Sequence, residues 1–303
     1  MTRRLLEIDD LTADELRAVL GLCLEPHPPQ VLAGKGAALL FEKPSVRTRH
    51  STEMAVVQLG GHPITVRADE MSLDVRETAE DVARTLAGYH AAIGARVFEH
   101  SKLERMAGAV DIPVFNLLSD DSHPLQAIAD LLTIEAEFGR LAGLTLAWVG
   151  DYSNVARSLA LASAASGLAV RFGCPPGYGP DELEIDRLRA WGGDVESFAY
   201  APDAVKGADV VSTDAWYAMG QEAEAVIRRR AFEGFTVDAA LLDQAAAGAI
   251  LLHCLPAHRG EEVADDAIDG PRSRVWAQAT NRMHAARGAL AFLLTDGLLG
   301  EGA

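Results

Sequence analysis

The chain has 303 residues, of which 49% are hydrophobic and 23% are charged, and its formal net charge is −17 at pH 7. Its length and apolar content predict a packed globular protein with two domains. The strong negative charge argues against nucleic acid or an anionic membrane as a partner, so an anionic substrate would need a local basic cluster to attract it.

The three cysteines are Cys23, Cys174 and Cys254, and they show no C-x-x-C spacing. This pattern encodes neither a disulfide framework nor a zinc ribbon. The sequence also contains no apolar run of about 18 residues and no apolar leader after Met1. We therefore expect a protein of the reducing cytoplasm.

The first half of the chain alternates between predicted strands and helices. Thr12 to Glu15 forms a capping-box pattern, and one helical face follows it, made of Leu16, Val19, Leu20 and Cys23. The next expected elements are a strand at 37–41, a helix at 48–59, a strand at 64–67, a helix at 78–89, a strand at 91–97, a helix at 102–107 and a strand at 114–117.

The second half repeats this alternation after a longer helix at 124–138, which is long enough to connect two lobes. The expected elements are strands at 145–149, 169–172, 195–198, 209–212 and 250–253, and helices at 155–165, 181–191, 222–231 and 281–298. The strands are apolar throughout, which is typical of parallel sheets covered on both faces. The fold class predicted from this pattern is α/β, with two lobes that each contain a parallel sheet with helices on both faces.

The segment from Phe41 to Arg49 has the composition of a phosphate site. Pro44 ends an apolar strand, and helical spacing then continues as far as Gly60. The turn combines the N–H groups of a helix start with hydroxyl and guanidinium groups, which suits a multiply charged oxyanion. These side chains belong to Ser45, Arg47, Thr48 and Arg49. The alternative is that the arginines are solvated surface charges. No P-loop motif is present, so a nucleoside triphosphate is not the expected ligand.

Polar residues follow most of the predicted strands, where open α/β sheets bind their ligands. In chain order they are Ser45 to Arg49, Arg96, His123 with Gln126, Asp151 to Asn154, Asp214 to Gly220, and His253 to Pro256. His123 and Gln126 would offer one titratable and one neutral hydrogen-bonding group at the same helix start. Structural alternatives stay open for each. Arg96 could extend to solvent, Asp214 could begin a turn, and Cys254 could be an inert buried thiol.

No resident cofactor or metal is predicted. The G-x-G-x-x-G motif is missing after the strand that ends at Val149, which argues against a nicotinamide or flavin cofactor. The sequence also lacks H-E-x-x-H and clusters of Cys and His, which argues against a catalytic metal.

Four of these segments form a series of motifs. They are Ser45-Val46-Arg47-Thr48-Arg49, His123-Pro124-Leu125-Gln126, Asp214-Ala215-Trp216-Tyr217-Ala218-Met219-Gly220 and His253-Cys254-Leu255-Pro256. In order and spacing this series resembles the signatures of the ornithine carbamoyltransferases. The resemblance extends along the whole chain and ends at Asn281 to Ala285. The first two motifs are similar to those of carbamoyltransferases in general, and the last two narrow the amine to ornithine.

The resemblance implies transfer of the carbamoyl group of carbamoyl phosphate to the δ-amino group of L-ornithine, which gives L-citrulline and phosphate in arginine metabolism. It implies a carbamoyl phosphate-binding domain of residues 1–135 plus the C-terminal helix 282–303, and an ornithine-binding domain of residues 136–281, linked by two interdomain helices. It also implies a homotrimer or a multiple of trimers, with sites near subunit boundaries.

Carried over residue by residue, the resemblance assigns roles to the motif side chains. The carbamoyl phosphate site would comprise Ser45, Val46, Arg47, Thr48, Arg96, His123, Gln126, Cys254, Leu255 and Arg282. The ornithine site would comprise Asn154, Asp214, Ala218 and Met219, with Asp214 at the α-amino group. The catalytic residues would be Arg96, His123, Cys254 and Asp214, and Thr48 would help Arg96 and His123 to polarise the carbonyl oxygen.

Three positions depart from the family's pattern. Ala218 replaces a usual serine, which removes a neutral hydrogen bond worth about 0.5–1.5 kcal/mol. Ser72 replaces a glutamine that reaches a neighbouring site, and Thr280 replaces an acidic residue. Two alternative hypotheses follow: a carbamoyltransferase for acetylornithine or putrescine, and a non-catalytic regulator on the same scaffold. Asp214 and Met219 argue against the first, and the complete phosphate motif argues against the second.

Overall fold

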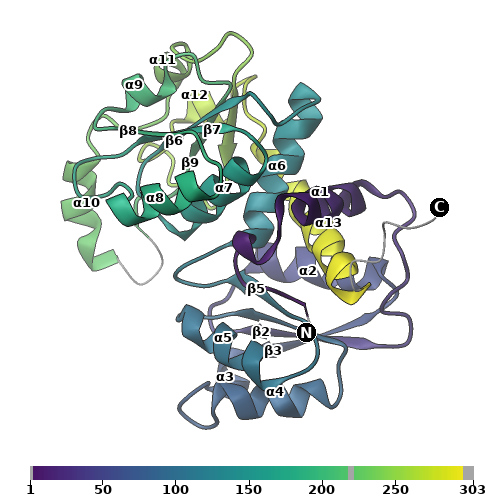
Figure 1. The fold of residues 1–303 in the computed structure, drawn as a ribbon. Helices are drawn as coiled ribbons and strands as arrows, with labels where there is room; N and C mark the ends of the chain where they lie inside the picture. Colours follow the sequence, from purple (N-terminus) through teal and green to yellow (C-terminus); the bar gives the residue numbers. More distant parts are fainter. Residues whose placement is uncertain (1–2, 218–221, 296–303) are drawn as a thin grey trace. The chain divides into compact units, whose positions relative to one another are not determined.

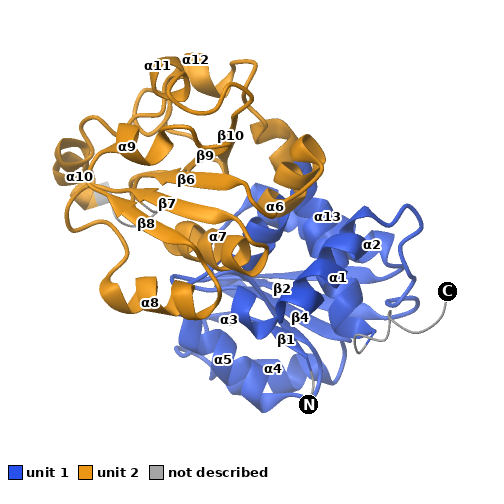
Figure 2. Cartoon of the chain, turned by 45° about the horizontal axis from the view of Figure 1, so that its top comes forward, with its two compact units in different colours: residues 1–129, 280–303 blue, residues 130–279 orange. Residues whose placement is uncertain are grey.

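The computed structural model describes residues 3–217 and 222–295. The chain divides into two compact units, one of residues 1–129 and 280–303 and one of residues 130–279 (Figure 2). Each unit contains a five-stranded sheet in which every strand pair is parallel. The predicted α/β class with two parallel sheets is confirmed.

The sheet of the first unit has the strand order β1-β5-β4-β2-β3. Its strands are β1 (Arg4–Leu5), β2 (Gly36–Phe41), β3 (His62–Arg67), β4 (Ala92–Arg96) and β5 (Val114–Leu118). β2 and β4 are almost fully buried, as their uniformly apolar sequences predict, whereas the edge strand β3 is partly exposed. The edge strand β1 was not predicted, because two residues carry no detectable periodicity.

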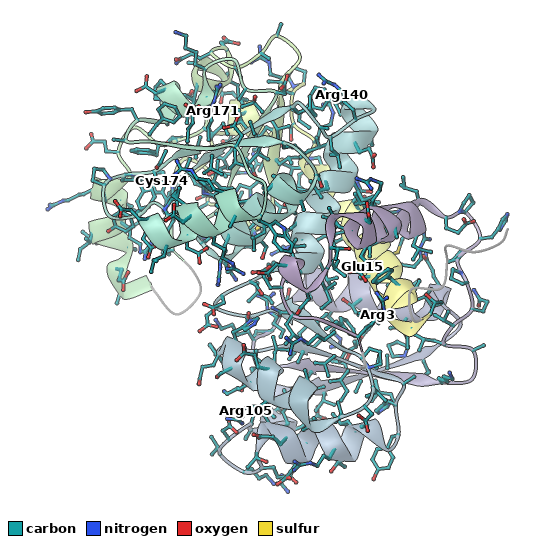
Figure 3. All side chains as sticks on the ribbon, viewed as in Figure 1. Arg3, Glu15, Arg105, Arg140, Arg171 and Cys174 are labelled. Atoms are coloured by element: carbon teal, nitrogen blue, oxygen red, sulfur yellow. The ribbon has the colours of Figure 1, made fainter. Side chains whose placement is uncertain are left out.

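Helices cover both faces of this sheet (Figure 1). The helices α1 (Ala13–Leu24) and α2 (Val46–Gln58) lie on one face, and α4 (Ala79–Ala87) and α5 (His100–Ala109) lie on the other. The predicted capping box is confirmed, because Thr12 accepts the Glu15 N–H and Glu15 accepts the Thr12 N–H. Glu15 also forms an ion pair of 2.8 Å with Arg3, which places α1 beside the start of β1 (Figure 3). The short elements η1 (Ile8–Asp10) and α3 (Ala68–Met71) complete this part of the chain.

The sheet of the second unit has the order β10-β9-β6-β7-β8. Its strands are β6 (Thr145–Val149), β7 (Ala169–Gly173), β8 (Val195–Phe198), β9 (Val210–Thr213) and β10 (Ile250–His253). The helices α7 (Asn154–Ala165) and α8 (Glu182–Ala190) lie on one face, and α9 (Ala201–Val205), α11 (Ala239–Leu242) and α12 (Asp265–Ile268) lie on the other (Figure 2). The last three are too short to show helical periodicity, and the sequence did not predict them. The helix expected at 222–231 is divided into η2 (Glu222–Glu224) and α10 (Ala225–Ala231).

Two helices pass through the boundary between the units. They are α6 (Pro124–Phe138), which has its predicted limits, and α13 (Val275–Leu294). The prediction that α13 begins at Asn281 is wrong, because the Gln278 N–H already donates to the Arg274 carbonyl at 2.8 Å and Asn281 lies inside the helix. Its predicted end at Leu298 lies outside the described residues. No helix in the described ranges is long and apolar enough to cross a membrane.

Candidate active site

The predicted phosphate turn joins β2 to α2 in the first unit. Ser45 is the N-cap of α2: its Oγ accepts the Thr48 N–H at 3.3 Å and lies 3.1 Å from the Thr48 hydroxyl. The N–H groups of Val46 and Arg47 belong to the first helical turn, where no carbonyl of the helix can accept them. Both side chains are exposed, Val46 to 74%. Val46 therefore offers an anion its backbone N–H, whereas Arg47 also offers a guanidinium.

Arg282 of α13 connects three of the predicted side chains. Its Nη2 donates to the Thr48 hydroxyl at 2.7 Å, and its Nη1 donates to Oε1 of Gln126 and lies 3.3 Å from Nε2 of His123. Gln126 and His123 are neighbours at the start of α6, as their spacing predicts. All four side chains are at most 7% exposed. The first unit thus brings residues from α2, α6 and α13 into one buried polar cluster.

Arg96 joins this cluster from the end of β4. Its Nη1 donates to the Thr48 hydroxyl at 3.4 Å, and the residue is only 9% exposed. The alternative that Arg96 extends to solvent is therefore excluded. Thr48 accepts from two guanidinium groups, and the acceptors Thr48 and Gln126 are both neutral. These bonds orient Arg96 and Arg282 without cancelling their positive charge, which suits the binding of a phosphate or a developing oxyanion.

His123 is held in its neutral form. Burial, followed by the charges of Arg282 and Arg96, holds the pKa of His123 well below its usual value of 6.5. The expectation of a titratable group at this position is therefore corrected. Because Nη1 of Arg282 can only donate, Nε2 of His123 accepts and the ring proton lies on Nδ1. His123 is a neutral hydrogen-bond donor through Nδ1.

Asp214 and Cys254 meet at the end of the second sheet. They follow β9 and β10, which are neighbouring strands whose last residues, Thr213 and His253, are register partners. This register places the next two side chains together, and Sγ of Cys254 donates to Oδ1 of Asp214 at 3.1 Å. Cys254 is partly exposed, so the expectation of a fully buried thiol is excluded. The prediction that strand ends collect functional residues explains this pair.

The carboxyl group of Asp214 has an unusual protonation equilibrium. Burial raises its pKa above the ordinary value of 3.8, although the hydrogen bond from Cys254 acts in the opposite direction. The thiol that orients this carboxylate is neutral. A ligand with an ammonium group would restore the stabilisation that burial removes from the ionised form.

A buried pair beneath Cys254 fixes the turn that carries it. The Leu255 N–H donates to Nδ1 of His253 at 2.9 Å, so Nε2 of His253 carries the proton and donates to Oε1 of Glu262 at 3.0 Å. The same oxygen accepts the His258 N–H at 2.6 Å. Leu255 has a φ of 61°, which is unfavourable for a residue with a branched side chain. The hydrogen bond from its N–H helps to hold this strained conformation.

Sequence analysis missed three buried polar residues around His253: Glu262, Gln278 and Asp130. Gln278 of α13 accepts the His253 N–H at 2.8 Å, and its Nε2 donates to Oδ1 of Asp130 on α6 at 2.7 Å. All three of these polar side chains are at most 1% exposed. Glu262 follows Glu261 in a polar stretch, which resembles a surface loop. Only the apolar periodicity around Asp130 and Gln278 could have indicated that these two lie on buried helical faces.

The remaining predicted ornithine residues are placed less completely. Asn154 begins α7, where its Oδ1 accepts the Val155 N–H at 3.0 Å. Asp214 is described, and Trp216 two residues later is part of the core at 4% exposure. Ala218 and Met219, the other two predicted contacts, lie outside the described residues.

Arg228 of α10 is a further residue that sequence analysis missed. It donates to Oδ2 of Asp151 and to the Trp216 carbonyl, both at 2.8 Å, and to Glu224 at 2.9 Å. Its guanidinium also lies over the Tyr178 ring. Arg228 therefore joins the segment after β9 to the segment after β6.

Two groups of side chains have the spacing of metal ligands among the described residues. They are Asp214 with His253 and Cys254, and His258 with Glu261 and Glu262. Both ring nitrogens of His253 are engaged by Leu255 and Glu262, and one Glu262 oxygen accepts two hydrogen bonds. Hydrogen bonding within the protein accounts for the close spacing of these groups.

Two family models match consecutive parts of the chain. Residues 3–136 match the carbamoyl-P binding domain of aspartate/ornithine carbamoyltransferases, and residues 142–293 match their Asp/Orn binding domain. The ornithine carbamoyltransferase of Acidothermus cellulolyticus is 46% identical over 97% of both chains.

Solved structures give the same result. The crystal structure of ornithine carbamoyltransferase from Thermus thermophilus has a TM-score of 0.89 at 42% identity, over 97% of this chain and 99% of that one. The enzyme from Pyrococcus furiosus has a TM-score of 0.91 at 44% identity, over 96% of both chains. The chain belongs to the aspartate/ornithine carbamoyltransferase family.

Proposed function

We propose that the protein transfers the carbamoyl group of carbamoyl phosphate to the δ-amino group of L-ornithine and so forms L-citrulline and phosphate. The observation that carries this proposal is the buried cluster of Thr48, Arg96, His123, Gln126 and Arg282 beside the capped start of α2. Neutral groups orient two guanidiniums there, which suits the binding of a doubly charged acyl phosphate. Family membership and the similarity to ornithine carbamoyltransferases support the choice of reaction.

In this proposal the first unit binds carbamoyl phosphate. The N–H groups of Val46 and Arg47, the hydroxyls of Ser45 and Thr48, and the guanidiniums of Arg47 and Arg96 hold the phosphate. Arg282 and Gln126 surround the carbamoyl amide in this proposal, together with Cys254 and Leu255 of the second unit. Thr48, Arg96 and Nδ1 of His123 donate to the carbonyl oxygen.

The chemical step follows from these contacts. The δ-nitrogen of ornithine attacks the carbonyl carbon, and the carbonyl oxygen becomes an oxyanion that the donors of the first unit stabilise. The bond from carbon to the phosphate oxygen then breaks, and phosphate leaves with the electron pair. The proton lost by the amine is accepted by phosphate. No covalent bond to Cys254 is formed.

The second unit binds ornithine in this proposal. Asp214 accepts the α-ammonium group, and Asn154 and the Met219 backbone bind the α-carboxylate. The δ-amine has a lysine-like pKa of about 10.4, so its deprotonation at pH 7 costs roughly 4–5 kcal/mol. The nearby positive charges that bind phosphate lower this cost.

Assembly and location complete the proposal. We expect a homotrimer or a multiple of trimers in the cytoplasm, acting in arginine biosynthesis or catabolism. Ser72, which replaces a glutamine of the family's pattern, has a left-handed backbone (φ 45°) and an exposed side chain. Size-exclusion chromatography with light scattering measures the assembly, and a monomer would contradict it.

The test of function is citrulline formation from carbamoyl phosphate, with ornithine, acetylornithine and putrescine compared side by side. We expect ornithine to have the highest kcat/KM. Ala218→Ser tests the departure at this position, and it should improve kcat/KM for ornithine by no more than about tenfold, the value of one neutral hydrogen bond. If all three amines fail while carbamoyl phosphate binds, the assignment of the first unit stands, that of the ornithine site fails, and the substrate must be a different one.

A further inference from the structure

Two segments of the second unit carry Asp214 and Cys254, and they are linked at two places. The first segment follows β9 and includes Asp214 and Tyr217, and the second follows β10 and runs from Cys254 to Glu262. The inner link is the hydrogen bond of 3.1 Å from Cys254 to Asp214. The outer link is a cluster of four side chains: Tyr217, Arg229, His258 and Glu261.

The outer link holds Tyr217 by both its ring and its hydroxyl. The ring stacks on His258, with centroids 5.1 Å apart and an angle of 21° between the planes. Nη2 of Arg229 donates to the Tyr217 hydroxyl at 3.2 Å, and this hydroxyl lies 3.4 Å from Oε1 of Glu261. Tyr217 therefore contacts α10 and the segment after β10 at once. Offset aromatic stacking adds to the area buried by the two rings.

The charges within this cluster are balanced. Arg229 donates to Oε1 of Glu261 through Nε at 3.1 Å and through Nη2 at 2.7 Å. Burial acts to raise the pKa of Glu261, but the hydrogen bonds from Arg229 and Tyr217 outweigh it and lower the pKa. Glu261 therefore stays ionised at neutral pH, and the hydroxyl of Tyr217 lies between two opposite charges.

The outer link is also anchored to the buried network beneath Cys254. The His258 N–H donates to Glu262 at 2.6 Å, and Glu262 accepts from His253 at 3.0 Å. Tyr217 thus stacks on His258, whose backbone is held by its hydrogen bond to Glu262. Tyr217 lies three residues after Asp214, so an anchor at Tyr217 limits the movement of Asp214.

We propose that Tyr217 is a positioning residue for ornithine, which keeps the segment of Asp214 beside the segment of Cys254 while the substrate binds. This inference rests on the proposed function, because it requires an α-ammonium group at Asp214. That group competes with the Cys254 thiol for the carboxylate, so binding weakens the inner link. The outer link makes none of the proposed substrate contacts. It keeps both segments in place while the inner link changes.

Steady-state kinetics of Tyr217 variants test the inference. We expect Tyr217→Ala to raise KM for ornithine about tenfold, which corresponds to about 1.4 kcal/mol, and to leave KM for carbamoyl phosphate within about twofold. Tyr217→Phe keeps the stacked ring and should raise KM for ornithine only about two- to threefold. Tyr200→Ala is the matched control, because Tyr200 lies in the same unit and is 70% exposed. It should change neither constant.

His258→Ala gives a second, independent variant. It removes the stacking partner, so it should raise KM for ornithine severalfold. The double variant of His258→Ala and Tyr217→Ala should have nearly the same KM for ornithine as Tyr217→Ala alone, because both changes remove the same contact.

The outcomes separate this inference from the proposed function. If the wild-type protein forms no citrulline, both fail. If it forms citrulline and Tyr217→Ala leaves KM for ornithine unchanged, the positioning role is overturned and the function stands. A loss of apparent kcat with both KM values unchanged would mean a smaller folded fraction, and it would also overturn the positioning role.

Discussion

The two clusters of candidate site residues carry opposite charges and are built in the same way. In the first unit, Arg96 and Arg282 are buried and donate to the neutral Thr48 hydroxyl. In the second, the Asp214 carboxylate accepts from the neutral Cys254 thiol. Each charged group is oriented by a partner that does not cancel its charge.

The difference between the clusters lies in what supports them. The cationic cluster is assembled from the ends of α2, α6 and β4 and from the middle of α13. The acidic pair, Asp214 with Cys254, is carried by the segments that follow β9 and β10. It depends on the buried hydrogen bond between His253 and Glu262 and on the side-chain contacts of Arg228 and Tyr217. A substitution in the first cluster should therefore change chemistry more than stability. In the second region, stability and substrate binding should change together.

The largest effect is expected for Arg96→Gln. Glutamine can still donate a hydrogen bond, but the positive charge at the phosphate and the developing oxyanion is lost. We expect kcat/KM for carbamoyl phosphate to fall about 10³-fold, while the free energy of unfolding changes by less than about 1 kcal/mol.

Arg17→Gln is the matched control for this change. Arg17 is an arginine of the same unit with a side chain that is 73% exposed, and kcat/KM should stay within about twofold of wild type. If Arg96→Gln loses less than about tenfold in kcat/KM, the charge of Arg96 is not needed. The interpretation of the Arg96 and Arg282 cluster as a cationic site would then be wrong.

The second-largest effect is expected for Glu262→Ala, because Glu262 supports the turn that carries Cys254. Glu262→Ala leaves two donors without their acceptor: the buried Nε2–H of His253 and the partly buried N–H of His258. We expect the free energy of unfolding to fall by about 3 kcal/mol, measured by urea denaturation. Glu262→Gln keeps one acceptor oxygen and should lose about half as much, and the exposed control Glu233→Ala should lose less than about 0.5 kcal/mol. Equal stability of Glu262→Ala and wild type would contradict a supporting role.

Asp214→Asn tests the charge of the acidic pair. KM for ornithine should rise about 10- to 100-fold, because a charge-assisted hydrogen bond worth about 1.5–3 kcal/mol is lost. Citrulline formation at saturating carbamoyl phosphate measures this rise. An unchanged KM would remove Asp214 from the ornithine site.

The same variant has a pH signature. Burial raises the pKa of Asp214 in the folded protein above its ordinary value of 3.8. Its contribution to stability is therefore complete below the ordinary value and is lost as the pH rises through the raised pKa. Asparagine does not ionise, so the stability of the variant relative to wild type should increase as the pH rises above about 4. Urea unfolding at several pH values measures this, and a difference independent of pH would show that Asp214 is not penalised by burial.

Most of the fold was predictable because its signals are local. Uniformly apolar strands predicted both sheets, and the Thr12 capping box predicted α1. The sequence also located the end of each of these strands. Asp214 and Cys254 each follow a strand end, so both were predicted to lie at the same edge of the sheet. The errors concern elements without a local signal, such as β1, the short helices and the start of α13.

The chemistry of the site was less predictable than its residue list. The environment of His123 depends on Arg96 and Arg282, which come from distant parts of the chain, so its neutral state could not be inferred from a His-x-x-Gln spacing. Glu262 was missed for the same reason, since only the fold shows that it is fully buried. Partners far apart in sequence decide the charge and burial of these groups.

The smallest effect is expected for Cys254→Ser. A serine hydroxyl is also a neutral donor, so the hydrogen bond to Asp214 survives, and kcat/KM for ornithine should fall by less than about tenfold. Cys254→Ala removes the donor and should have the larger effect on KM for ornithine. A single turnover with radiolabelled carbamoyl phosphate should leave no label on the wild-type protein. If the label instead remains on Cys254 and Cys254→Ser abolishes turnover, the thiol is a nucleophile. It would then no longer serve as the neutral partner of a charged group, and the parallel between the two clusters would hold only for the cationic one.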